Sequence, residues 1–492
     1  SCTGALAVAG SVGVGASVVT LTLSSQANSI IDENVIVKGS ENVTIISDVD
    51  YRFDIYVVGF AASGSLAVGA NVITIVYDSI VNSKINKNSN ISGNGSLLIM
   101  ARENQHLDAK LGGIAGAGAV GINASAITMV VSSNVNIEIG DNTIINLAGD
   151  KNISYDGIIA TGIKILAVTN QEYYTYLVIA SGAGTVAVSA NAVILILKNK
   201  VGINSGLSSS LTTSKNVNIN IENNTNLKAY IGALAVSGTV AVVPGVLYVN
   251  STKSGKISLL SNISAINVNI NSYDSSNFEG VLVGASGSLV AVSGVALVLM
   301  IDNTVNANVN SGTINATNVD VQAINEVKNR MLTGTFNAGG AAVGLQTIVI
   351  MMNSSIEATV NHVNANSLVV KATGIEDLDN IVAIGGSVGG VAVAGSAVVV
   401  ILNNTVSAKI NANANVKANT VTVEADDTIT IGANAGSAGI GAIGAGAAVN
   451  VLLIKNTVNA IVGNNAIVTG IDGGYASSVK ILTKVIRDIT AI

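Results

Sequence analysis

The chain has 492 residues, of which 49% are hydrophobic and only 11% are charged, and it contains 52 glycines, one proline and one cysteine. A net charge of −6 with four scattered arginines excludes a basic surface of the kind that binds nucleic acid. Cys2 has no partner for an internal disulfide, and His106 and His362 have no cysteine or second histidine near them to form a metal site.

Long uncharged stretches recur along the chain, and each ends in a short polar element. Residues 381–408 carry no charge and are long enough to cross a bilayer as a helix. Their residues alternate with period two, as they do in residues 64–76, and β-branched residues and glycine dominate. Near-continuous apolar runs of this kind are typical of buried strands. The sequence therefore predicts strands and not membrane-spanning helices.

The short element reads IDNTVNANV at 301–309, LNNTVSAKI at 402–410 and IKNTVNAIV at 454–462, with weaker copies toward the N-terminus. The residue at its Thr position falls at 26, 80, 134, 200, 252, 304, 355, 405 and 457. Nine copies, each about 52 residues long, predict a single repeat array over residues 1–492. Periods of this length are typical of solenoids, propellers and arrays.

Two kinds of residue recur at fixed positions and are predicted to be structural. A glycine lies sixteen residues before the marker in seven copies, at Gly10, Gly64, Gly118, Gly184, Gly339, Gly389 and Gly441. We expect it to permit close sheet packing or a bend. An asparagine directly precedes the marker in the clearest copies, at Asn303, Asn404 and Asn456. Parallel stacking of the repeats would place each asparagine over another and form hydrogen-bonded ladders.

These patterns predict an all-β protein with the architecture of a parallel β-solenoid. A repeat with two apolar strand faces cannot bury them alone, and stacking covers each repeat with its neighbours. Two coils of about 26 residues per repeat would give a rod of roughly 85 Å. A β-propeller is the alternative, because its blades are four-stranded and of similar length. The chain begins inside a Gly/Ala arm and ends just past a strand, so we expect a section of a longer array.

One repeat is longer than the others. The excess lies around residues 140–157, which are polar and turn-like, and it is predicted to be a loop insertion in a regular stack. The densest aromatic group, Tyr173, Tyr174 and Tyr176, follows it in the sequence EYYTY. Tyrosines of an ordinary strand explain this group, and a surface that contacts a partner is the alternative.

Candidate catalytic and ligand-binding groups are weak. The acidic runs at 376–379 and 424–427 are predicted to be solvated turns, and Asp48, Asp50 and Asp54 lack the central glycine and final glutamate of a calcium loop. The glycine-rich stretches lack the Gly-Lys-Ser/Thr ending of a phosphate-binding loop. The sequence therefore predicts no enzymatic activity, no cofactor and no metal.

Arms such as GSVGVGASVVTLTL and GGVAVAGSAVVVIL, followed by NNTVSAKI, resemble the repeats of very large bacterial exoproteins of the filamentous-haemagglutinin-like and leukotoxin types. The resemblance covers all nine copies. It implies export by two-partner secretion, a β-helical shaft, and adhesion to host cells or their killing.

The expected function is that of a non-catalytic shaft segment of a secreted or surface-displayed bacterial adhesin or toxin, and hence of a virulence factor. The expected partner is a host-cell surface or matrix component, or further repeats of the same protein. Membrane contact other than by helical spans is compatible with the apolar arms. A membrane-active, leukotoxin-like segment and a self-assembling extracellular filament subunit are the two alternative functions.

Overall fold

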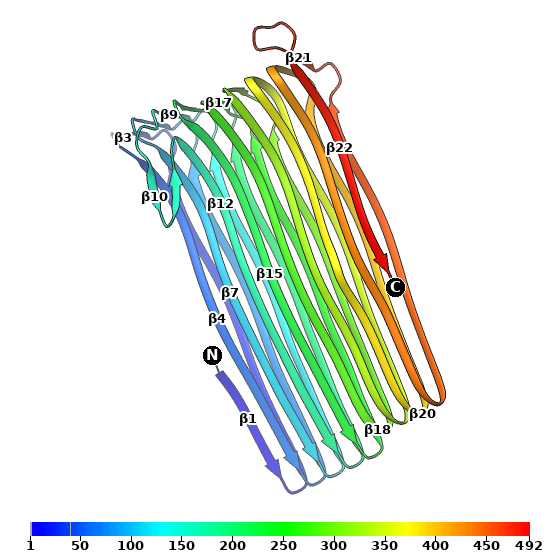
Figure 1. The fold of residues 1–492 in the computed structure, drawn as a ribbon. Helices are drawn as coiled ribbons and strands as arrows, with labels where there is room; N and C mark the ends of the chain where they lie inside the picture. The colour runs from blue at the N-terminus through cyan, green and yellow to red at the C-terminus, as the bar shows by residue number, and fades with distance from the viewer. Residues whose placement is uncertain (1, 40) are drawn as a thin grey trace.

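The structure is a computed structural model that describes residues 2–39 and 41–492. These residues form strands and turns, and none of them belongs to a helix long and apolar enough to cross a membrane. A parallel sheet winds into a flat solenoid of two layers (Figure 1). The predicted all-β parallel solenoid is confirmed. The propeller alternative is wrong, because successive repeats pair with one another along one open stack.

The first layer contains β1 (Cys2–Ala9), β4 (Val43–Ser63), β7 (Leu97–Ala117), β12 (Ile163–Ala183) and β15 (Asn216–Ser237). The second layer contains β2 (Val12–Ile31), β5 (Leu66–Ile85), β8 (Val120–Ile139), β13 (Val186–Ser205) and β16 (Val240–Leu259). Short strands lead from the second layer back to the first: β3 (Ile36–Gly39), β6 (Asn90–Gly93), β9 (Ile144–Leu147), β14 (Ser210–Thr213), β17 (Asn262–Ser264), β19 (Thr313–Asn315) and β21 (Ile467–Thr469). β18 (Asn267–Val309) and β20 (Asn318–Val462) run through both layers, and β22 (Ser478–Ala491) returns to the first.

Each repeat forms one coil of this solenoid. Val43 of β4 lies beside Leu97 of β7, one full repeat later, and Asn216 of β15 lies beside Asn267 of β18. The expectation of two coils per repeat is therefore wrong. Strands of about 20 residues are about 65 Å long, whereas nine coils stacked about 4.8 Å apart rise only about 43 Å. The chain forms a broad slab and not the expected rod of roughly 85 Å.

The strand register moves one of the repeat markers. Lys200 pairs with Ser254, and Ser254 pairs with Thr304. The fifth marker is therefore Ser254 and not the residue at 252. The first markers hold, because Gln26 pairs with Ile80 as the repeat predicts.

A tight turn joins the two layers at one end of the slab, which we call the tip, and the predicted glycines lie in this turn. A Cβ atom on Gly118 would lie 2.0 Å from the carbonyl oxygen of Gly64, and one on Gly389 would lie 2.0 Å from that of Gly339. Side chains larger than hydrogen would therefore push successive turns apart. The glycines lie at a bend, and at all of them except Gly10 the close packing is between stacked turns and not between the two layers.

The opposite end of the slab, which we call the head, contains the short strands and the turns before them. Asn34, Asn88 and Asn142 have φ values of 60°, 59° and 54°, in the left-handed region that asparagine adopts more readily than most residues. Asn88 donates a side-chain hydrogen bond to Asn34 at 3.3 Å, and Asn142 donates one to Asn88 at 3.2 Å. Asparagine ladders along the stacking axis are therefore present in this turn. They are not formed at Asn303, which lies beside Lys253 and Ser354 and donates to Asn325 of the other layer.

Two apolar cores fill the space between the layers, and polar side chains separate them. Ile99 and Val135 belong to the core on the head side, whereas Leu107 and Met129 belong to the core on the tip side. Between the two cores lies a row of buried polar residues on each layer, which we call the polar belt. Its first-layer row includes Glu103, Thr169, Asn223, Asp274 and Asn325, and its second-layer row includes Ser79, Ser133, Asn199, Lys253 and Asn303.

The insertion in the third coil lies later in the chain than predicted. Leu147 still pairs with Gly93 of the preceding coil, and regular pairing resumes where Ile163 lies beside Leu97. The additional residues are therefore within 148–162, where the preceding coil has 94–96. The predicted range of 140–157 includes residues that belong to the regular coil.

The insertion is a β-hairpin and not an irregular loop. β10 (Ile153–Tyr155) and β11 (Ile158–Ala160) pair antiparallel on the outside of the first layer, near the head (Figure 1). Ile153 and Ala160 pack against an apolar patch on that layer, which includes Leu98 and Leu166. An ion pair of 2.6 Å between Arg102 and Asp156 also fixes the hairpin to the sheet.

Candidate functional site

The outer face of the first layer carries the predicted tyrosine group. Strand alternation turns Tyr174 and Tyr176 outward, where each is half-buried, but it turns Tyr173 into the core, where the residue is 0% exposed. The Tyr173 hydroxyl donates a hydrogen bond to Oε1 of Gln105 at 2.7 Å. Tyr173 therefore cannot contact a partner, and that part of the expectation is wrong. Tyr174 and Tyr176 lie mid-sheet, on β12 between β7 and β15.

Tyr176 belongs to a row of side chains that crosses four coils, which we call the aromatic row: Tyr56, Lys110, Tyr176 and Tyr230. The rings of Tyr176 and Tyr230 stack with their centroids 5.2 Å apart. Nζ of Lys110 lies 5.0 Å from the ring centroid of Tyr56 and 5.6 Å from that of Tyr176. The row therefore combines ring stacking with cation–π contacts on an exposed sheet face.

Two further rows, closer to the head, contain charged side chains, one with His106 and Glu172 and the next with Tyr174 and Lys228. Nδ1 of His106 lies 2.9 Å from a carboxylate oxygen of Glu172, and the His106 ring lies 5.4 Å from that of Tyr174. Nζ of Lys228 lies 6.0 Å from the Tyr174 ring centroid. The Tyr230 hydroxyl donates to Glu279 at 2.7 Å. Burial, and then this hydrogen bond, raise the pKa of Tyr230 to about 12, so it stays a hydrogen-bond donor at neutral pH.

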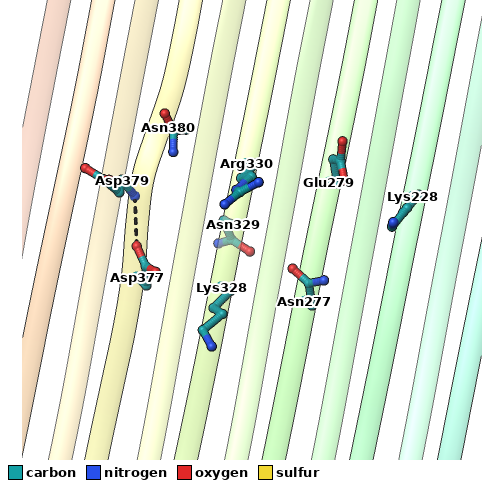
Figure 2. A pocket seen from close by; sticks show the side chains of 9 residues that line it. All are labelled: Lys228, Asn277, Glu279, Lys328, Asn329, Arg330, Asp377, Asp379 and Asn380. Atoms are coloured by element: carbon teal, nitrogen blue, oxygen red, sulfur yellow. Dashed lines mark hydrogen bonds between the residues drawn. The ribbon is translucent and has the colours of Figure 1, made fainter.

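A shallow pocket of about 310 Å³ continues this surface over the following coils (Figure 2). Three cations and three carboxylates line it together with three amides: Lys228, Lys328, Arg330, Glu279, Asp377, Asp379, Asn277, Asn329 and Asn380. Lys328 is already paired with Glu326 at 2.7 Å. Such a lining can exchange hydrogen bonds with a polar partner. It brings together no nucleophile and base, and within residues 2–39 and 41–492 no cluster of His, Cys, Asp and Glu could hold a metal.

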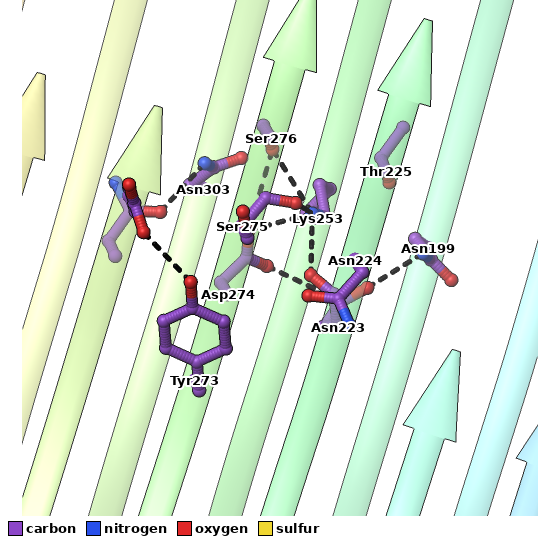
Figure 3. A network of polar contacts seen from close by, with 12 residues as sticks. Asn199, Asn223, Asn224, Thr225, Lys253, Tyr273, Asp274, Ser275, Ser276 and Asn303 are labelled. Atoms are coloured by element: carbon purple, nitrogen blue, oxygen red, sulfur yellow. Dashed lines mark hydrogen bonds and ion pairs between the residues drawn. The ribbon is translucent and has the colours of Figure 1, made fainter. Parts of the chain in front are cut away.

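The polar belt contains a buried charged pair that is not among the residues predicted from the sequence. Nζ of Lys253 lies 2.7 Å from Oδ1 of Asp274, and the two side chains are 1% and 0% exposed (Figure 3). Lys253 also donates to the carbonyl oxygens of Asn223 at 2.8 Å and Ser275 at 2.9 Å. Nδ2 of Asn223 donates to the second Asp274 oxygen at 2.8 Å. Burial lowers the pKa of Lys253 and raises that of Asp274, and their mutual attraction opposes both shifts.

Neutral asparagine pairs take the place of this charged pair in the coils on either side. Asn199 and Asn303 flank Lys253 in the second layer, and Asn223 and Asn325 flank Asp274 in the first. Asn199 donates to Asn223 at 2.7 Å, and Asn303 donates to Asn325 at 2.9 Å. The belt thus links the two layers by cross-layer hydrogen bonds, and its chemistry is structural.

Two acidic residues predicted to lie in solvated turns are buried in the interior. Glu376 and Asp427 are 1% and 0% exposed, so the prediction is wrong for both of them. Asp377 and Asp379 lie on the outer face and line the pocket. Burial first, and then the neighbouring Asp427 carboxylate, raise the pKa of Glu376 well above its ordinary value. Burial also raises the pKa of Asp427.

We expect Glu376→Gln to make the protein more stable at pH 8 and to reduce the pH dependence of unfolding. Because the folded-state pKa of Glu376 is raised above 4.5, the stability that its protonation provides is complete below pH 4.5 and is lost as the pH rises through the raised value. Each pKa unit by which the folded and unfolded states differ is worth about 1.4 kcal/mol. We therefore expect the free energy of unfolding to increase by about 1–2 kcal/mol at pH 8. Denaturant titrations at pH 5 and pH 8 measure it.

Glu222→Gln is the matched control, because Glu222 is exposed on the outer face of β15. Its unfolding midpoint should follow that of the native protein at both pH values. If the two variants have the same effect, the pH dependence does not originate at Glu376.

The residues predicted to be structural lie in the interior or in the tip turn. Asn303 and Asn404 are buried in the polar belt, and Asn456 is half-buried and donates to Asp427. Lys253 and Asp274 are not among the residues predicted from the sequence, although a signal exists. Lys253 shares strand parity with the apolar Val249 and Ile257, and this parity places it among inward-facing side chains. A charge at such a position requires a buried partner.

Comparisons with known proteins identify no relative. No protein-family model, no curated protein and no solved structure matches the chain.

Proposed function

We propose that this chain is a rigid, non-catalytic shaft segment of a large bacterial protein that is secreted or displayed at the cell surface and that interacts with host cells. The observation that carries the proposal is the in-register stacking of long strands, repeat upon repeat, with asparagine ladders along the axis. Each coil contacts only its neighbours, so that length can be added without changing the fold.

The irregular outer surface of the first layer is the proposed contact region for a host-cell partner. Regular coils present similar surfaces, whereas the β10–β11 hairpin interrupts the repeat. The aromatic row and the charged pocket lie on the same face and supply ring area, cations and carboxylates. Binding residues are commonly placed on irregular segments that a rigid scaffold positions.

Cell binding by two surface variants tests this proposal. One variant replaces residues 148–162 with the Asn-Gly-Ser of residues 94–96, which restores the regular coil. It also carries Leu166→Thr, which makes the patch that the hairpin no longer covers less apolar. The other carries Tyr174→Ser and Tyr176→Ser and leaves the buried Tyr173 intact. We expect at least one variant to lose binding to host cells by about tenfold or more, because interface tyrosines often contribute over 1.4 kcal/mol.

Tyr248→Ser is the control, since Tyr248 lies half-buried on β16 in the other layer. It should bind like the native protein. The free energy of unfolding of every variant should stay within about 1 kcal/mol of that of the native protein. Binding that survives both surface changes in folded proteins would place the contact elsewhere.

A further inference from the structure

The outer surface near the tip is apolar on both layers. On the second layer one outward row reads Val14, Val68, Ile122, Val188, Val242, Val292 and Val343. On the first layer one outward row reads Phe60, Ile114, Ala180, Leu234, Ala285 and Phe336. We call this surface the tip band. Val178, Ile114 and Phe336 in it are 63%, 51% and 56% exposed.

The interior behind the tip band is more polar than its outside. Behind the valine row, the next inward row reads Gly15, Gly69, Asn123, Ser189, Val243, Ser293 and Gly344. Buried hydroxyls and amides pair there, as Ser189 does with Ser181 at 2.8 Å and Ser293 with Asn337 at 2.6 Å. A sandwich that faces only water has the opposite pattern, whereas proteins that face hydrocarbon place apolar side chains outside and polar ones inside.

Charges are absent from the tip band in successive coils. In successive coils the uncharged segments are 55–77, 111–137, 173–197, 229–252, 280–301, 331–356, 380–408 and 428–454, and each of them passes around the tip turn. On β4, β7, β12 and β15 the uncharged parts have 9, 7, 11 and 9 residues, a mean of nine that corresponds to about 30 Å of strand, and those on the second layer are longer. The hydrocarbon core of a bilayer is also about 30 Å thick, and strands that cross it have about 9–11 residues.

The side chains at the boundary of the tip band also fit a membrane interface. Tyr56, Tyr176, Tyr230 and Lys110 form the aromatic row where the uncharged segments of the first layer begin. Tyrosine is enriched at the level of lipid headgroups, where its ring and hydroxyl face different surroundings, and lysine extends toward water there. Coil-to-coil pairing satisfies the backbone groups of the coils that have a neighbour on each side, and this is a condition for entering hydrocarbon.

We propose that the tip band docks edge-on into the hydrocarbon layer of a lipid bilayer, with the aromatic row at the level of the headgroups. A protein partner or a second copy would cover one layer. The tip band covers both layers and the turn between them, and a lipid phase can surround all three surfaces. This role goes beyond that of a shaft, because it assigns the slab an orientation relative to a membrane.

Flotation with vesicles of zwitterionic phosphatidylcholine at about 1 M salt tests the proposal, since this salt concentration screens surface charge. The native chain should float with the vesicles. A variant with Ile114→Glu, Val178→Glu and Leu234→Glu should lose about tenfold or more of the floating fraction. The matched control carries Ile144→Glu, Ile159→Glu and Leu207→Glu, which are 46%, 64% and 56% exposed and lie toward the head. The control should float like the native chain.

A second measurement tests the orientation. The chain contains no tryptophan, so Phe336→Trp and Ile159→Trp each introduce a single emitter, one at the tip and one on the hairpin. Lipids with brominated acyl chains should quench the emission of Phe336→Trp and leave that of Ile159→Trp unchanged.

Three results would overturn the proposal. The first is that the native chain remains in the aqueous fraction, and the second is that the tip variant floats as well as the native chain. The third is that the brominated lipids quench both emitters equally. If sedimentation without lipid shows a dimer that the tip variant abolishes, and the native chain does not float, then the tip band binds a second copy. Unchanged circular dichroism and denaturation midpoints confirm that the variants are folded.

Discussion

Gly184→Val is expected to lower the free energy of unfolding by about 3 kcal/mol or more, because overpacking in a region that cannot relax is costly. A Cβ atom at this position would lie 2.1 Å from the carbonyl oxygen of Gly118 in the preceding turn. Strand pairing on both sides of the turn sets the distance between coils, so the carbonyl cannot withdraw alone. The same clash recurs at Gly389, whose Cβ would lie 2.0 Å from the oxygen of Gly339.

Gly182→Val is the matched control, because Gly182 lies two residues earlier and a Cβ there would have no heavy atom within 4 Å. Valine also has a higher strand propensity than glycine. We therefore expect the free energy of unfolding to change by no more than about 0.5 kcal/mol or to increase slightly. Chemical denaturation followed by far-UV circular dichroism measures both variants. Equal midpoints for the two would show that the stacked turns can separate without cost.

The sequence predicts the stacking of the coils, because parallel in-register pairing requires like residues at like positions. The glycine that recurs sixteen residues before the marker reflects this pairing, because Gly118 stacks on Gly64 and Gly184 on Gly118. The number of coils per repeat could not be derived in the same way. A period of about 52 residues fits two short coils or one wide coil, and strand alternation continues through the charged segment in both cases. Only the register, with Val43 beside Leu97, distinguishes them.

The surface features were less predictable than the stack. Alternation by itself places Tyr173 on the inward parity of Leu177 and Ile179, so its burial could have been inferred. The fold-back of the hairpin could not, since it depends on an apolar patch formed by Leu98 and Leu166 from different coils. The charges that cluster around Glu376 predict a turn, but clustering along the chain does not determine the face of a strand on which a residue lies.

Lys253→Asn should destabilise the protein by about 3–5 kcal/mol, and so should Asp274→Asn, since each change leaves the other charge buried without its partner. The double variant Lys253→Asn with Asp274→Asn should return to within about 1 kcal/mol of the native protein. It extends the neutral pairs that Asn199 forms with Asn223 and Asn303 forms with Asn325 in the adjacent coils. Equilibrium denaturation at pH 7 compares the four proteins.

The pH dependence of the single variant separates a buried charge from a simple packing defect. In Lys253→Asn the Asp274 carboxyl loses the attraction that lowers its pKa, while burial continues to raise it. The folded state then favours the protonated acid, so the deficit relative to the native protein should shrink as the pH falls from 8 to 4. The double variant has no such acid and should show no comparable change. A deficit that stays constant over this range in Lys253→Asn would mean that the loss comes from packing and not from the unpaired carboxylate.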